Sequence, residues 1–161
     1  MLITSKHKAL LAQRKQALIS RLPIPGLLLS CLLMAGHAQG EESRLVVKLQ
    51  GVRDNTGSLR ASLYRDPENF RKEDKAVKVI SVPAAKGDAE LVFDNVPPGR
   101  YAIMAYHDEN ADQKLNLRLG MFPTEGYGLS NNPKVMGPPK FADSAFDIAG
   151  AKTAIDINLA Y

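Results

Sequence analysis

Side chains that can do chemistry are concentrated in residues 107–132, HDENADQKLNLRLGMFPTEGYGLSNN. The segment contains His107, the only histidine after His37, and many of the chain's carboxylate and amide groups. An imidazole can act as a general base or bind a transition metal, and clustered oxygens can bind a hard cation. We therefore expect the functional site here.

The first half of this segment partly matches a calcium-binding loop, in which alternate residues supply oxygen ligands. The matching residues are Asp108, Asn110, Asp112 and Asn116. Gln113 stands where the template has glycine, and Leu119 stands where it has a bidentate glutamate, a role that Glu125 could fill by folding back. The alternative is a turn network in which the Asp and Asn side chains bond to nearby backbone N–H groups. Calcium is thus the one cofactor the pattern suggests, and none is established.

His107 has three interpretations. Beside Asp108 and Glu109 it can serve as a general base or as a metal ligand, or it can be a structural hydrogen-bonding group. No second histidine and no cysteine follows residue 38 to complete a zinc site, and no nucleophile motif surrounds Ser130. We therefore assign no catalytic residue. Tyr127, flanked by glycines, is interpreted as an apolar lip for a ligand or as a pin for the loop. The residues predicted to contact a ligand are His107, Glu109, Glu125, Tyr127 and Asn131.

The elements that must position this segment are predicted to be strands. Alternation of apolar and polar residues, with turn signals between the runs, predicts strands at residues 45–50, 58–65, 76–82, 89–93, 101–107, 141–148 and 153–159. The first two are expected to form a hairpin. The fifth has two apolar faces, which predicts a central strand. The fold class is therefore all-β, a single antiparallel sandwich of about seven strands. One long loop, residues 108–140, separates the fifth and sixth strands.

The N-terminus has the features of an export signal. Five basic residues and no acidic one precede a short apolar run, and small residues follow at Gly36 and Ala38. We predict a signal peptide at residues 1–38, with cleavage after Ala38 or Gly40, and a sandwich domain at residues 39–161. The apolar run is too short to remain as a membrane anchor. The expected location is periplasmic or secreted.

Processing changes the charge of the chain. The loss of five basic residues reduces Lys+Arg from 21 to 16 while Asp+Glu stays at 17, so the net charge changes from +4 to −1. No basic surface remains that would indicate nucleic-acid binding.

Two motifs carry a resemblance to a known family. FDNVPPGRYAIMAYHDEN at residues 93–110 and LGMFPTEGYGLSNN at residues 119–132 resemble a family of exported bacterial proteins that is known only as a domain of unknown function. The resemblance implies a sandwich like that of prealbumin or immunoglobulin domains and supplies no activity.

Three functions are compatible with these features. The leading hypothesis is a non-enzymatic module that binds a ligand or protein partner of the cell envelope through the 107–132 loop. The second is a structural or assembly module whose loop braces the fold. The third is a periplasmic hydrolase that uses His107.

Overall fold

The computed structural model describes residues 43–161. The predicted signal peptide and its cleavage sites lie outside the described residues. The strands are β1 (Ser43–Val52), β2 (Ser58–Tyr64), β3 (Lys78–Pro83), β4 (Gly87–Val96), β5 (Gly99–Asp108), β6 (Leu117–Arg118), β7 (Phe122–Pro123), β8 (Tyr127–Leu129), β9 (Phe146–Ile148) and β10 (Lys152–Asn158). The helices are the 3₁₀ turns η1 (Pro67–Asn69) and η2 (Glu73–Lys75) and the short α1 (Phe141–Ser144). No helix among residues 43–161 is long and apolar enough to cross a membrane.

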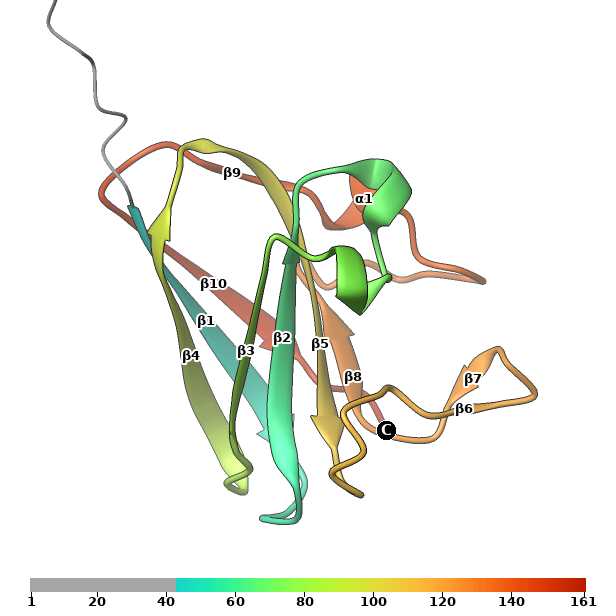
Figure 1. Cartoon of the computed structure of the whole chain (residues 1–161). Helices are drawn as coiled ribbons and strands as arrows, with labels where there is room; N and C mark the ends of the chain where they lie inside the picture. Colours follow the sequence, from blue (N-terminus) through green and yellow to red (C-terminus); the bar gives the residue numbers. More distant parts are fainter. Residues whose placement is uncertain (1–42) are drawn as a thin grey trace, which may run out of the picture. The chain divides into compact units, whose positions relative to one another are not determined.

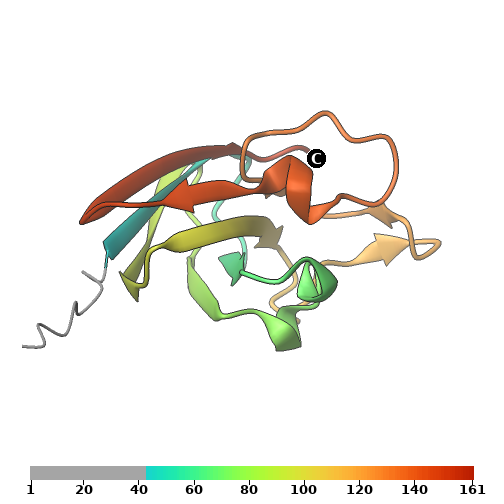
Figure 2. The same cartoon turned by 90° about the horizontal axis from the view of Figure 1, so that it is seen from above.

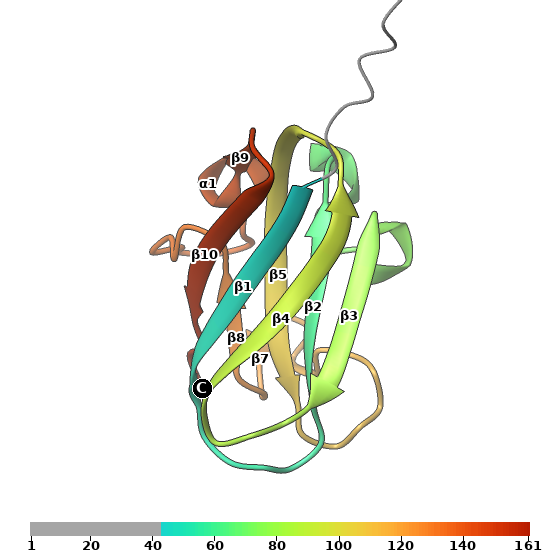
Figure 3. The same ribbon diagram turned by 90° about the vertical axis from the view of Figure 1, so that its left-hand side faces the viewer.

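Two sheets form the sandwich (Figure 1; Figure 3), and β6 and β7 pair as a separate two-stranded sheet. One has the order β10-β1-β4, and the other has the order β3-β2-β5-β8, with β9 also paired to β5. The pairs are antiparallel except β1 and β10, which are parallel. The all-β prediction is confirmed. The strand count is higher than predicted because β6, β7 and β8 lie inside the segment predicted to be a long loop.

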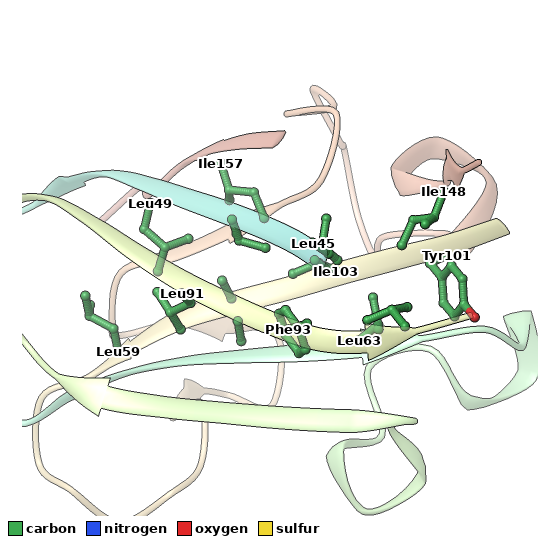
Figure 4. Packing of buried hydrophobic residues seen from close by; sticks show 14 of the residues in the cluster. Leu45, Leu49, Leu59, Leu63, Leu91, Phe93, Tyr101, Ile103, Ile148 and Ile157 are labelled. Atoms are coloured by element: carbon green, nitrogen blue, oxygen red, sulfur yellow. The ribbon is translucent and has the colours of Figure 1, made fainter. Parts of the chain in front are cut away.

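The hydrophobic core fills the space between the two sheets, which lie one over the other in Figure 2. As predicted from their alternation, the inward residues of β1 and β2 are fully buried: Leu45, Val47, Leu49, Leu59, Ala61 and Leu63. From β5, Ile103 and Ala105 point into the same cluster, which Leu91 and Phe93 of β4 complete (Figure 4). Period-two alternation therefore determines which face of each strand is buried.

The predicted hairpin between the first two strands is wrong. β1 pairs with β4 and β10, whereas β2 pairs with β3 and β5 in the opposite sheet. The turn after Val52 thus crosses from one sheet to the other. Two strands with one apolar face each can bury those faces either side by side in one sheet or across a sandwich, and alternation alone does not distinguish the two.

The predicted strand at residues 141–148 is only half correct. Residues Phe146–Ile148 form β9, but Phe141–Ser144 form one helical turn. The turn places Phe141, Ser144 and Ala145 on one side, where all three are buried. The ring of Phe141 packs edge-on against that of Phe70, with ring centroids 5.9 Å apart. Packing against a second, smaller cluster thus overrides the local strand pattern.

Candidate functional site

The outer face of the sheet that contains β5 carries a row of tyrosines and polar groups. The register places Arg60 of β2 opposite Tyr106 of β5, and Tyr106 opposite Tyr127 of β8. One pair further along, Met104 lies between Ser62 and Leu129. Because directly paired residues of antiparallel strands point to the same side, these side chains share one surface.

Glu73 of η2 closes one end of this face. Its carboxylate forms an ion pair with Arg60 and accepts hydrogen bonds from Ser62 Oγ at 3.0 Å and from the Tyr106 hydroxyl at 3.1 Å. The Tyr106 hydroxyl in turn accepts from Arg60 Nε at 3.0 Å. The side chain of Arg60 is 13% exposed and that of Glu73 is 29% exposed. Within the charged segment at residues 71–75, the carboxylate of Glu73 therefore turns toward the sheet, and both of its oxygens are paired.

The pKa values of these groups reflect burial and pairing. Burial raises the pKa of Tyr64 to about 12, with Glu73 and Asp74 adding to the effect. Burial, followed by the nearby charge of Glu73, raises the pKa of Tyr106 further. Burial alone would lower the pKa of Arg60, but the hydrogen bond and charge of Glu73 raise it on balance. Both tyrosines therefore stay neutral and Arg60 stays charged at physiological pH.

A pocket of about 630 Å³ lies on this outer face. Its floor is formed by Tyr64, Met104, Tyr106 and Tyr127. One wall is the segment that contains β6 and β7, with Lys114, Leu115, Leu117, Met121 and Phe122, and the other comprises Arg71, Glu73 and residues of the 135–139 loop. We call it the outer-face pocket. Its volume is in the range of small-molecule sites, and its lining is largely apolar.

The β6–β7 hairpin projects from the side of the sandwich (Figure 1; Figure 2). Its apolar side chains are exposed: Leu119 by 80%, Met121 by 69% and Phe122 by 55%. Met121 and Phe122 line the pocket, whereas Leu119 does not. A hairpin that only braced the fold would be expected to bury such side chains.

His107 lies apart from this pocket, near the C-terminal end of β5, where its side chain is fully buried. Its Nε2 is 2.7 Å from the carbonyl oxygen of Thr56, and its Nδ1 is 2.9 Å from the hydroxyl of Tyr161. A carbonyl only accepts, so Nε2 carries the proton, and Nδ1 accepts from the Tyr161 hydroxyl when the imidazole is neutral. That hydroxyl accepts from the backbone N–H of Arg53 at 3.0 Å. His107 thus joins three segments of the chain.

The serine considered as a nucleophile does not contact His107. Ser130 is buried, accepts a hydrogen bond from the backbone N–H of Ile103 and donates to the carbonyl of Ser144. Both ring nitrogens of His107 are engaged elsewhere. This arrangement does not support the hydrolase hypothesis.

Two buried carboxylates hold the loop after β5. Asp108 accepts hydrogen bonds from the backbone N–H groups of Asp112 at 3.1 Å and Gln113 at 3.0 Å. Glu125 accepts from the backbone N–H groups of Glu109 at 3.1 Å and Asn116 at 2.9 Å. Each carboxylate therefore fastens two points of the backbone, which is how a loop without regular structure satisfies its N–H groups.

The remaining predicted calcium ligands bond to one another. Asp112 accepts from the side-chain amides of Asn110 and Asn116, and it accepts from the backbone N–H of Lys114. These hydrogen bonds, with that of Asn116 foremost, lower the pKa of Asp112. Among residues 43–161, no three His, Cys, Asp or Glu side chains are grouped as a metal site requires. The arrangement is that of the turn network, and the calcium interpretation stays a prediction.

Of the residues predicted to contact a ligand, the structure brings only Tyr127 to the outer-face pocket. His107 and Glu125 are buried elsewhere, and Glu109 forms an ion pair with Arg53. Asn131 is exposed and donates to the carbonyl of Ala145 at 2.8 Å.

Sequence reasoning missed most of the pocket, including Glu73, Met104 and Tyr106. The available signal was the second face of the strand at residues 101–107. It is as apolar as the first, and a second apolar face must be covered by something.

Comparison with known proteins provides one match. Residues 47–156 match a family described as "Uncharacterized protein conserved in bacteria (DUF2141)". No curated protein and no solved structure matches the chain.

Proposed function

Because the chain belongs to this uncharacterized bacterial family, which supplies no activity, we propose its function from the site itself. The protein is an exported, non-enzymatic binding module that holds a small, largely apolar ligand in the outer-face pocket. The observation that carries the proposal is the pocket of about 630 Å³, one wall of which is the largely apolar segment that contains the β6–β7 hairpin of the 107–132 loop.

The two halves of the 107–132 loop support different roles. The first half is fastened by the buried carboxylates of Asp108 and Glu125. The second half presents exposed Met121 and Phe122 to the pocket. A structural role explains the hydrogen bonds of the first half, but it does not explain why the apolar side chains of the hairpin are exposed. We therefore favour binding over a purely structural role, with the braced half positioning the hairpin.

A charge placed in the pocket tests the proposal. The uncharged fluorophore N-phenyl-1-naphthylamine should bind the protein, and Met121→Asp should weaken that binding about tenfold, because a carboxylate in an apolar site must be desolvated. Leu119→Asp is the matched control, since it adds the same charge to the same hairpin outside the pocket. It should bind the fluorophore as the unmodified protein does.

The outcomes that contradict the proposal are equally specific. If the unmodified protein does not bind the fluorophore, there is no functional apolar site. If Met121→Asp and Leu119→Asp weaken binding equally, the fluorophore reports general exposure of the hairpin rather than the pocket. Thermal melting of both variants establishes that the fold is retained.

Export is tested by processing. Protein recovered from the periplasm should begin at Gln39 or Glu41, following cleavage after Ala38 or Gly40. N-terminal sequencing measures this directly. Gly36→Arg should shift cleavage to the second site, because it puts a large side chain in the small-residue motif of the first site and leaves Ala38 and Gly40 of the second site intact. A soluble periplasmic species that still begins at Met1 would refute the signal-peptide prediction.

A further inference from the structure

The charged groups that line the outer-face pocket are not balanced. Arg71 and Lys114 both line it, as does Glu73. The carboxylate of Glu73 is already paired with Arg60 and hydrogen-bonded to Ser62 and Tyr106. Among residues 43–161, neither Arg71 nor Lys114 forms an ion pair. The lining of the pocket thus has an excess of positive charge, because no carboxylate of the described residues forms an ion pair with Arg71 or Lys114.

One further carboxylate lies near Lys114. Asp112 is close enough for Lys114 to contribute to lowering the pKa of Asp112. However, the Asp112 carboxylate is occupied by the amides of Asn110 and Asn116 and does not line the pocket. The Asp112 carboxylate therefore reduces the positive potential at Lys114, but it leaves space inside the pocket for an anionic group of a ligand.

The surplus does not follow from the charge of the chain as a whole. Residues 39–161 carry 16 Lys and Arg against 17 Asp and Glu, a net charge of −1. A positive lining on a nearly neutral chain is a local feature, and local fields of one sign select ligands of the opposite sign. The backbone at Arg71 has φ +71°, an uncommon conformation for a residue other than glycine.

We infer that the ligand of the outer-face pocket is an anionic amphiphile, such as a long-chain carboxylate. Its apolar body lies against Met104, Met121 and Phe122, and its acidic group pairs with Arg71 or Lys114. This inference rests on the proposed function and specifies its ligand class. The pocket volume suits one such molecule and is too small for a folded partner.

The inference is tested by competition with two amphiphiles that have the same chain and opposite charge. Dodecanoate and dodecyltrimethylammonium, each below its micelle concentration, are titrated against bound N-phenyl-1-naphthylamine. Dodecanoate should displace the fluorophore at a concentration about tenfold lower, and the preference should shrink as salt is raised. The double variant Arg71→Gln with Lys114→Gln should lose the preference while binding the uncharged fluorophore as before, and the single variants show which cation contributes more.

A matched variant controls for overall charge. Arg118→Gln removes a positive charge from the same hairpin at an exposed position that does not line the pocket, and it should keep the preference for dodecanoate. If the fluorophore binds but both amphiphiles compete equally, or if Arg118→Gln abolishes the preference as the double variant does, the inference is overturned and the proposed apolar site stands. If neither the fluorophore nor dodecanoate binds, the proposed function itself is overturned.

Discussion

Replacement of Gly57 by alanine is expected to destabilise the protein by more than about 4 kcal/mol, the range in which single substitutions prevent folding of marginally stable domains. A Cβ atom on Gly57 would lie 1.9 Å from the carbonyl oxygen of Asp108 and 2.9 Å from the Cα of Glu109. Both are backbone atoms at the end of the central strand β5, so no side-chain rotation relieves the overlap. The turn between the two sheets must therefore move away from β5.

That movement would also break the hydrogen bond of His107. The neighbouring carbonyl of Thr56 accepts from His107 Nε2 at 2.7 Å, which is possible because the backbone passes so close to β5 at Gly57. Separation of the two segments would leave a buried imidazole N–H without its acceptor, which adds the cost of an unsatisfied buried polar group. The close approach of Gly57 to β5 and the hydrogen bond of His107 to Thr56 thus depend on each other.

Gly120 provides a matched control for the conformational part of this effect. Both glycines have φ +68°, but a Cβ on Gly120 meets no atom within 4 Å. Gly120→Ala should therefore cost only the strain of alanine in the left-handed region, about 1–2 kcal/mol. Urea denaturation of the two variants measures the difference. Equal midpoints would show that the approach of Gly57 to β5 is not maintained in solution.

Asp108→Asn is expected to destabilise the protein by about 2–4 kcal/mol, because charge-assisted hydrogen bonds and buried unpaired donors have costs of this size. The side chain is fully buried, and its two carboxylate oxygens accept from the N–H groups of Asp112 and Gln113. An asparagine of nearly the same shape would direct an NH₂ group at one of these donors. Asp112→Asn is the matched control, since the same change at an exposed side chain should have a much smaller effect.

The same experiment distinguishes a calcium site from a brace, by which we mean the hydrogen bonds that Asp108 and Glu125 accept from the loop backbone. Thermal melting of Asp108→Asn and of the unmodified protein is measured with calcium and with a chelator. We expect the loss of stability to be the same in both solutions, because the carboxylate oxygens of Asp108 already accept hydrogen bonds from backbone N–H groups. A melting temperature of the unmodified protein that rises with calcium, with the rise lost in Asp108→Asn, would instead support the metal interpretation.

The outer-face pocket and the brace are linked through β5. Its inner face carries Ile103 and ends at the buried His107, and its outer face supplies Met104 and Tyr106 to the pocket. The loop fastened by Asp108 leaves the end of this strand and leads directly to β6. Loosening the brace is thus expected to disturb the hairpin wall of the pocket as well as the stability of the fold.

Local sequence patterns were sufficient to predict the all-β class, the inward faces of the long strands and the central place of β5. These features depend on alternation within a few residues, and the structure agrees at Leu45, Leu59 and Ile103, all fully buried. Local alternation does not say which strands are neighbours. For this reason, the pairing of β1 with β4 and β10, the crossing of the turn at Gly57 and the helical turn at Phe141 depend on the tertiary structure.

The sequence likewise indicated which residues of the site are close in the chain, but not which groups contact them in the folded protein. The density of oxygens in the 107–132 segment was visible, but their use depends on which groups the folded chain places opposite them. The structure places backbone N–H groups opposite Asp108 and Glu125. The pocket is equally non-local: Glu73 and Tyr106, which both line it, are 33 residues apart in the chain, and Arg60 joins them because the register of β2 and β5 pairs it with Tyr106. A carboxylate fastens a loop or binds a cation according to its partners, and only tertiary structure determines those partners.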